Sequence, residues 1–298
     1  MTAFAAATSC VGDTRLHLSI WQSAVLGATQ GLSEFLPVSS SGHLILVPWA
    51  ANWRDVYCAK QGNKFFDVAL HMGTFLGAVI YLRREVRALV RGFFSSVRAR
   101  AVRTTEERLA WLLVFSAIPG ALAGALFEDV IAEKLGQPWQ IAAFLAVFGI
   151  LLYVVDRRAA QRTAMADLSR TQVGAMAVAQ MLALMPGVSR SGVTITAARA
   201  GGVDRDAAAR FSFLMSLPII FGAGLYGALS LSDGGGLNGQ TLQFAVGVVV
   251  SAITGAVAVF GLLSYLRRHS FGAFAVYRLA AAAAVVALIA TGARSATI

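Results

Sequence analysis

The stretch from Thr241 to Leu266 contains no charged residue and is apolar almost throughout. A helix of roughly 20 apolar residues is long enough to cross the hydrocarbon core of a bilayer. Runs of this kind also lie near residues 65–82, 110–127, 139–155, 211–231 and 271–291. Only 13% of the 298 residues are charged, against about 25% in a soluble domain. We therefore expect an all-α integral membrane protein with six transmembrane helices.

The net charge of +10 does not indicate a nucleic-acid-binding protein, because the basic residues lie between the apolar runs. Segments 83–108, 157–170, 199–210 and 267–268 hold 17 of the 25 Lys and Arg residues. Short loops rich in Lys and Arg stay on the cytoplasmic side of a membrane. The pattern predicts a multi-pass protein with both termini on the outer side. The first 20 residues lack a basic region followed by an apolar core, so we expect no secretory signal there.

Two further segments are apolar but broken. The pattern from Leu18 to Leu36 stops at Pro37, and a short arm, residues 44–49, follows the Ser39–Gly42 loop. The second segment, residues 172–185, stops at Pro186-Gly187 and is followed by an arm that reaches Ala200. Irregular backbone at membrane depth is tolerated only where protein or a water-filled cavity covers it. We interpret both segments as re-entrant helical hairpins.

A hairpin followed by three spans occurs twice, and an odd number of spans places the second copy upside down. Residues 38–42 (Val-Ser-Ser-Ser-Gly) correspond to residues 188–192 (Val-Ser-Arg-Ser-Gly) at an offset of 150, as does Gln30 to Gln180. The pattern predicts one membrane domain over 1–298, with an inverted-topology repeat of halves at about 18–155 and 171–292 after a polar extension, 1–17. In such repeats the site lies at the interface of the halves, near the midplane.

The two loops carry groups that are costly inside a membrane. Glu34 and His43 flank the first loop, and Arg190 lies in the second. Ionisable groups at membrane depth mark functional sites by default. Loops of small residues that lead into a helix present backbone N–H groups to anions, and an arginine fork suits phosphate oxygens. We expect the loops to meet and bind a diphosphate. Serine and glycine also pack membrane helices closely, which would account for the serines if they stood alone.

Glu34 and His43 are nine residues apart, and folding of the hairpin is expected to bring them together. A carboxylate beside an imidazole orients it or raises its basicity. Ser40 is a candidate nucleophile toward phosphorus, and direct attack by a water that His43 or Glu34 positions is the alternative. Glu34 could instead hold a divalent cation, which prefers oxygen ligands.

Other polar residues in the apolar segments are interpreted as structural. Asp67 and His71 lie four apart, on one helical face, and we expect a polar pair that steadies the first hairpin. Arg278, near a helix end, is expected to be a snorkelling or a structural arginine. The spacing of Gly73 and Gly77 is typical of a helix-packing face.

Cys10 and Cys58 lack the spacing of metal ligands. They are interpreted as unrelated thiols, with a disulfide as the alternative hypothesis, because both fall on the side assigned to the outside, where a bridge could persist.

Two motifs carry a family resemblance. The first is Gln30-Gly-Leu-Ser-Glu34 followed by the Pro37–His43 loop, and the second is Pro186–Ser191 with Thr194 beyond it. Residues 66–69 (Phe-Asp-Val-Ala) and 277–278 (Tyr-Arg) add to them. The chain resembles, over nearly its whole length, the undecaprenyl-diphosphate phosphatase family, also called bacitracin-resistance proteins.

The resemblance implies an enzyme of the bacterial inner membrane. It would hydrolyse the C55 isoprenyl diphosphate to the monophosphate and phosphate, which recycles the lipid carrier for peptidoglycan synthesis and confers bacitracin resistance. It also implies dependence on Mg²⁺ or Ca²⁺. By matching position, the catalytic set is Glu34, Ser40, His43 and Arg190, with Glu34 as metal ligand. The substrate-binding set is Gln30, Ser39, Ser41, Ser189, Ser191 and Thr194.

One position departs from the pattern, because Gln30 stands where some members have Glu. A metal would then be held mainly by Glu34 and by substrate oxygens. A lipid-phosphate transporter or flippase is the main alternative function, since inverted repeats and broken helices are also the architecture of transporters. A structural scaffold would explain none of the polar loops. Substrate access from the outer side is expected, and a homodimer is compatible with the sequence.

Overall fold

The computed structural model describes residues 16–57, 60–232 and 239–298, and these residues are almost entirely helical. Cys10 and Cys58 lie outside them, so the hypothesis of a disulfide stays untested. Within the described ranges the β structure amounts to one isolated bridge, between Thr163 and Val203. The expected all-α class is confirmed.

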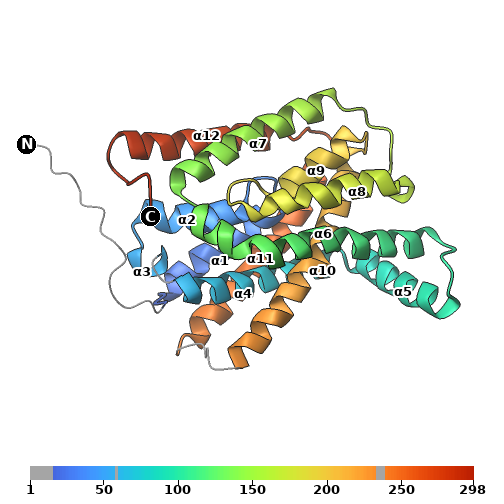
Figure 1. The fold of residues 1–298 in the computed structure, drawn as a ribbon, viewed down its shortest axis with the longest axis horizontal. Helices are drawn as coiled ribbons and strands as arrows, with labels where there is room; N and C mark the ends of the chain where they lie inside the picture. Colours follow the sequence, from blue (N-terminus) through green and yellow to red (C-terminus); the bar gives the residue numbers. More distant parts are fainter. Residues whose placement is uncertain (1–15, 58–59, 233–238) are drawn as a thin grey trace, which may run out of the picture.

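The helices follow one another with short connections (Figure 1). In chain order they are α1 (Ile20–Phe35), α2 (Ser40–Ala51), α3 (Arg54–Tyr57), α4 (Lys60–Tyr81), α5 (Arg83–Ala99), α6 (Thr105–Lys134), α7 (Pro138–Arg158), the 3₁₀ helix η1 (Met165–Asp167), α8 (Arg170–Ala179), the 3₁₀ helix η2 (Gln180–Leu184), α9 (Arg190–Ala200), α10 (Arg205–Ser232), α11 (Thr241–Leu266) and α12 (Gly272–Ala290).

Five helices in the described residues are long and apolar enough to cross a membrane: α6, α7, α10, α11 and α12. The pair α4 and α5 passes the same test together, although the two helices meet at a bend of 90°. The chain is thus a multi-pass membrane protein by length and composition, with a sixth span when the bent pair is counted as one.

The basic segment 83–108, expected to be a loop, is largely helical. The basic segment 83–108 forms α5 and the start of α6, because Leu89, Gly92 and Ser96 recur at helical spacing and are buried. Residues 128–134 continue α6, and α4 begins at Lys60, inside the polar segment 51–64. Polar residues change where a helix leaves the membrane, but a helix stops only at a breaking residue or a cap.

The breaks in the two hairpins have a clear local cause. Pro37 and Pro186 have no backbone N–H, and the residue before a proline is driven toward extended backbone. Leu36 (φ −66°, ψ 141°) and Met185 (φ −79°, ψ 120°) adopt that conformation and end α1 and η2. The chain then turns, and α2 and α9 begin at Ser40 and Arg190. Each hairpin therefore consists of two helical arms joined by a short loop.

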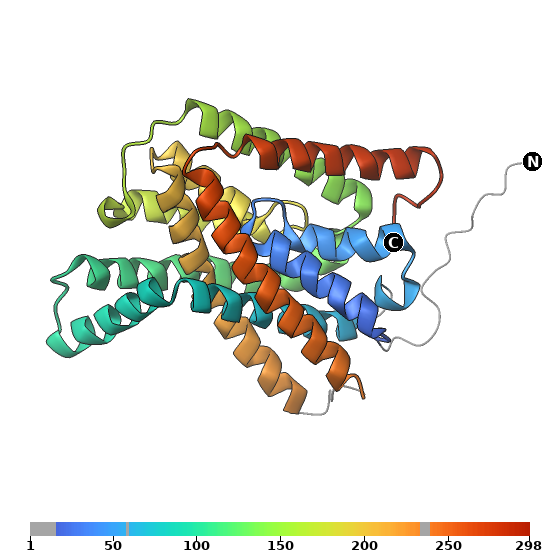
Figure 2. The same cartoon turned by 180° about the vertical axis from the view of Figure 1, so that it is seen from behind.

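Helix α11 packs between α1 and α4 (Figure 2), and glycines make this approach close. A Cβ atom on Gly27 would lie 2.5 Å from the carbonyl oxygen of Gly247. On the other side, Cβ atoms on Gly73 and Gly77 would lie 2.5 and 2.3 Å from carbonyl oxygens of α11. The expected packing face of Gly73 and Gly77 is thereby confirmed.

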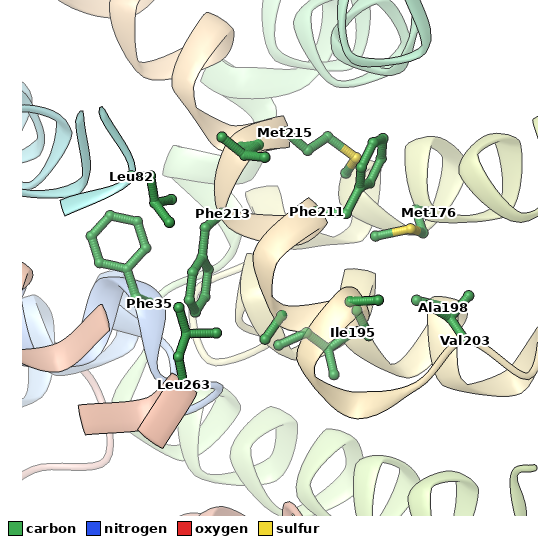
Figure 3. Close-up of a cluster of buried hydrophobic side chains, with 14 of the residues drawn as sticks. Phe35, Leu82, Met176, Ile195, Ala198, Val203, Phe211, Phe213, Met215 and Leu263 are labelled. Carbon is green, nitrogen blue, oxygen red and sulfur yellow. The ribbon is translucent and has the colours of Figure 1, made fainter. Parts of the chain in front are cut away.

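A cluster of buried apolar side chains joins the first hairpin to the second half of the chain (Figure 3). Phe35, the last residue of α1, is fully buried and packs edge-on against Phe213 of α10, with ring centroids 5.2 Å apart. Leu82 and Leu263 lie in the same cluster. Because Phe35 follows Glu34, this core fixes the position of that carboxylate.

Helix ends gather in two groups. Arg162 N donates to Gly202 O (3.0 Å), and Phe271 N donates to the Asp156 carboxylate (3.2 Å), which ties the ends of α7, α9 and α12 together. We call this the basic end, because the arginine-rich connections lie here. In the other group, Trp49 Nε1 donates to Ser295 O (3.1 Å), and Ile298 N donates to Gln137 Oε1 (2.8 Å).

Candidate active site

Two serines begin the second arms of the hairpins with the same unusual backbone. Ser39 has φ 77° and Ser189 has φ 76°, in the left-handed region that residues other than glycine rarely adopt. Ser189 accepts a hydrogen bond from Gly192 N (3.1 Å), which caps α9. Backbone strain of this kind persists only where the surroundings enforce it, and it concentrates at functional sites.

The two loops touch each other directly. Gly187 N donates to Ser39 Oγ (3.1 Å), and Ser191 Oγ donates to Leu36 O (3.0 Å). A Cβ atom on Gly42 would lie 3.2 Å from Gly187 Cα, so the backbones are packed together at this point. The prediction that the two loops meet is confirmed.

Arg278 of α12 holds the loops in this contact. Its side chain is fully buried and donates to Pro37 O of the first loop (3.2 Å) and to Gly187 O (2.9 Å) and Val188 O (3.0 Å) of the second. It also donates to Leu145 O (3.1 Å) and Phe144 O (3.3 Å) of α7. The expectation of a structural arginine is confirmed, and its structural task is to join the two loops.

Glu34 lies at the centre of the site and is surrounded by donors. Arg190 Nη2 contacts Oε1 at 2.5 Å, while Ser40 Oγ (2.6 Å) and Gln30 Nε2 (2.9 Å) donate to Oε2. His71 Nε2 lies 3.4 Å from Oε2. The side chain of Glu34 is only 4% exposed, and a buried carboxylate needs partners of this kind to stay ionised.

The imidazole beside Glu34 is therefore His71, and the expected pairing of Glu34 with His43 is wrong. His71 Nδ1 lies 2.7 Å from the backbone oxygen of Asp67, which can only accept, so Nδ1 carries a hydrogen. Nε2 faces a carboxylate, which also only accepts. A hydrogen on Nε2 as well would make His71 an imidazolium paired with this carboxylate. His71 contacts both Asp67 and Glu34 of the first hairpin, so the polar pair expected of Asp67 and His71 extends into the site.

His43 points to another neighbour. Its Nδ1 lies 2.7 Å from Ser39 O and its Nε2 lies 2.8 Å from the hydroxyl of Tyr277, whose ring stacks on the imidazole at 5.6 Å. The carbonyl fixes the hydrogen on Nδ1, so Nε2 accepts from Tyr277. His43 follows Ser40 by three residues on α2, which places both on one helical face.

One guanidinium nitrogen of Arg190, Nη1, has no hydrogen-bond partner. While Nη2 is bound to Glu34, its Nη1 is buried and is one of three buried side-chain atoms in the described residues that have no hydrogen-bond partner. The others are Oε1 of Gln30 and Oε1 of Gln180. A buried, unpaired guanidinium nitrogen is costly unless a ligand satisfies it.

The remaining predicted residues surround this centre with different functions. Ser189 and Ser191 are buried, with hydroxyls 3.3 Å apart. Thr194 bonds Ser212 Oγ of α10 (2.7 Å) and so supports α9. Ser41 is half-buried in the first turn of α2. The loops thus place predicted polar groups from both halves in one region.

The carboxylate of Glu34 and the orphaned amide oxygen of Gln30 are donors of the type that Mg²⁺ and Ca²⁺ accept. No group of three or more His, Cys, Asp or Glu side chains that could hold a metal occurs in the part of the chain that the structure describes. A divalent cation fits here only when a ligand supplies most of the oxygens.

Two residues of the site, His71 and Tyr277, were not predicted from the sequence. His71 was visible through its spacing from Asp67, but nothing in the sequence shows that α4 passes beside Glu34. Tyr277 belongs to a motif of the resemblance, yet it reaches His43 across 234 positions of sequence. A tertiary contact of that range has no local signal.

The chain is similar to known proteins over most of its length. Residues 23–284 match the family model described as "Bacitracin resistance protein BacA". The undecaprenyl-diphosphatase of Pelobacter propionicus is 44% identical over 92% of this chain and 99% of its own. That of Desulforudis audaxviator is 43% identical over 87% and 94%, and that of Gemmatimonas aurantiaca is 41% identical over 92% and 99%.

Proposed function

The chain belongs to the bacitracin resistance protein family, and we infer from this membership that it is an undecaprenyl-diphosphatase of the membrane. Hydrolysis would split the phosphoric anhydride of the C55 isoprenyl diphosphate into the lipid monophosphate and inorganic phosphate. The single observation that carries the assignment to this site is Arg190, which contacts Glu34 with one nitrogen and leaves a buried nitrogen unpaired.

We propose that the terminal phosphoryl group binds between the two loops. The unpaired Nη1 of Arg190 and the N–H groups that begin α2 and α9 would bind its oxygens. Phosphoryl transfer needs mainly positioning and stabilisation of charge on these oxygens. Nη2 would keep its contact with Glu34 Oε1 while Nη1 binds the phosphate, so Arg190 would link the carboxylate to the bound diphosphate.

Ser40 is proposed as the nucleophile. Its hydroxyl already donates to Glu34 Oε2 at 2.6 Å, so Glu34 can take the proton as Oγ attacks the terminal phosphorus. The Oγ–P bond forms, the anhydride P–O bond breaks, and the lipid monophosphate leaves with that bond's electrons. Water then cleaves the phosphoserine. In the alternative, water attacks directly and Ser40 only binds phosphate.

His43 is proposed to act on the water or on the leaving oxygen. It lies one helical turn from Ser40, and the Ser39 carbonyl fixes its ring orientation. Its Nε2 lone pair points to Tyr277, which holds it until substrate arrives. Gln30, Ser39, Ser41, Ser189, Ser191 and Thr194 are proposed to hold these groups and the phosphate in place.

A divalent cation, Mg²⁺ or Ca²⁺, is proposed as the cofactor. Glu34 and the free Oε1 of Gln30 would hold it together with diphosphate oxygens. When bound, it would neutralise charge on the diphosphate. The protein groups described above bind and orient the phosphoryl group.

The architecture is proposed to be an inverted-topology repeat of six spans and two re-entrant hairpins, within one domain. Packing supports this arrangement, because α1 and α4 pack on α11 while α8 and α10 pack on α6. The halves are about 18–155 and 171–292. We propose the inner membrane, with the basic end in the cytoplasm and both termini outside. The first hairpin then opens outward, which favours substrate entry from that side.

Phosphate release from the C55 diphosphate by purified protein in detergent tests the function, because no transport is possible without a bilayer. A flippase needs the phosphate site but no Ser40–Glu34 contact. Release at the rate of a protein-free control would overturn the enzyme assignment. Isolation of phosphoserine at residue 40 after rapid quenching would decide between the two routes of attack.

A further inference from the structure

Helix α5 is turned by 90° from α4 at Leu82, at the basic end of the molecule. One face, with Leu89, Gly92 and Ser96, is buried, and α5 packs on α6. The rest of the helix surface is exposed and carries two stripes of different chemistry. Neither stripe takes part in the site described above.

The first stripe is basic. Arg84, Arg87, Arg91 and Arg98 follow one another at intervals of a helical turn or two, so they lie on one face, and all four are exposed. The one acidic residue of α5, Glu85, contacts Arg210 of α10 (3.0 Å). We call the four arginines the arginine stripe.

The second stripe is apolar and lies beside the first. Val90, Phe94 and Val97, at intervals of four and three residues, are 50%, 65% and 49% exposed. An aromatic row runs from it into α6: Phe94 packs on Phe93 (5.5 Å) and Phe93 on Trp111 (5.0 Å). Aromatic residues, Trp above all, concentrate where a protein crosses the surface of a bilayer.

At the bend between α4 and α5 the surface is hollowed. Tyr81, Arg83, Arg84, Glu85 and Arg210 line a cavity of about 240 Å³. Arg84 thus belongs to both the stripe and the cavity. Arg210 is already bound to Glu85 (3.0 Å) and to Asp206 (2.6 Å). Arginine forks bind phosphate oxygens in bidentate fashion, so Arg83 and Arg84 remain to bind a phosphodiester at this cavity.

We propose that α5 lies on the leaflet at the basic end and binds anionic phospholipids. Val90, Phe94 and Val97 insert among the acyl chains, while the arginine stripe and the cavity bind headgroup phosphates. A helix with one apolar face and one rich in Arg lies in the membrane interface and prefers anionic lipid. The apolar stripe adjoins exposed Phe115 of the candidate span α6, which indicates lipid rather than a protein partner as its occupant.

The test compares retained lipid in native mass spectra of the full-length protein from nanodiscs of phosphatidylcholine mixed with phosphatidylglycerol. Each basic residue near an anionic surface contributes about fivefold in affinity. Replacing the arginine stripe by glutamine (R84Q/R87Q/R91Q/R98Q) is expected to lower the preference for phosphatidylglycerol about tenfold or more. Phe94→Ser is expected to reduce the amount of both lipids retained.

The matched control is R157Q/R158Q/R162Q/R170Q, which removes the same charge from another connection at the basic end. It is expected to keep most of the preference. An equal loss of phosphatidylglycerol preference in both quadruple variants would show that only net charge matters, and would overturn the proposal. An unchanged preference in the α5 variant would overturn it as well. Circular dichroism and phosphate release in detergent, expected unchanged, separate loss of lipid from loss of fold.

Discussion

The guanidinium of Arg190 contacts the carboxylate of Glu34 at 2.5 Å, although the two residues lie 156 positions apart and come from different hairpins. An ion pair buried to this degree is held only where both charges find further donors or acceptors. Glu34 finds them in Ser40, Gln30 and His71. Arg190 has no acceptor for Nη1. This difference identifies the guanidinium as the group that can bind a ligand.

Replacement of Arg190 should lower turnover sharply. Arg190→Ala is expected to lower kcat by about 100-fold or more, the magnitude of losing one donor to charge that develops in the transition state. Arg190→Lys keeps the charge but loses the fork, so it should restore only part of the rate. Phosphate release kinetics check both variants. Near-normal turnover of Arg190→Ala would exclude this residue from the mechanism, and Arg162→Ala, at an exposed position, is the control.

Loss of His71 should affect the rate more than binding. Without the imidazole, the carboxylate of Glu34 loses a neighbour at 3.4 Å from Oε2 and can rotate away from Ser40. Small misplacements cost up to about 100-fold in rate. His71→Ala is expected to lower kcat about 10- to 100-fold with KM little changed. His71→Gln, which can still donate to Glu34, should recover part of it. His269→Ala, at the basic end, should leave both parameters intact.

Arg278 should govern stability. Arg278→Met removes the donor to five backbone carbonyls, three of which belong to the two loops. A buried polar group without a partner costs about 1–3 kcal/mol. We expect a loss of about 3 kcal/mol or more in the free energy of unfolding, measured by denaturation in detergent. Arg157→Met, which removes an arginine that lies over the Tyr153 ring, should change it by less than about 1 kcal/mol. Comparable losses in the two variants would contradict the structural task assigned to Arg278.

Gly187 should tolerate no side chain. It has φ 100°, and a Cβ atom there would lie 2.8 Å from Ile141 O. Gly187→Ala is expected to push the loops apart and abolish phosphate release. Gly261, in the exposed middle of α11, has nothing within 4 Å of a Cβ atom, so Gly261→Ala should stabilise α11 by up to about 1 kcal/mol. Full activity of Gly187→Ala would show that the contact between the loops is dispensable.

Much of the fold follows from local sequence. Apolar length predicts α11 from Thr241 to Leu266, as observed, and Pro37 and Pro186 mark the breaks in the hairpins. Charge failed as a guide to helix ends: the arginines of 83–99 were expected in a loop, yet apolar residues between them at helical spacing build α5. Polarity reports position relative to the membrane, whereas helix ends depend on capping and on breaking residues.

The site was predictable as a set of residues but not as a set of contacts. Small residues, a carboxylate and an arginine at membrane depth identify the two loops. The choice between His43 and His71 as partner of Glu34 depends on how α4 packs against α1 through α11. The close glycine contacts of Gly27, Gly73 and Gly77 with α11 decide that packing. Proximity in sequence favoured His43, and tertiary packing placed His71 there instead.

The bonds of Arg278 to both loop tips restrict how the protein can move. Parting the tips would strip the fully buried guanidinium of Arg278 of its acceptors on at least one side. The two tips must therefore move together, as one rigid unit in the middle of the molecule. Entry of the lipid substrate and exit of the products then require displacement of the helices around this unit. Any alternating exposure of the site to the two sides of the membrane is limited to motions of those helices.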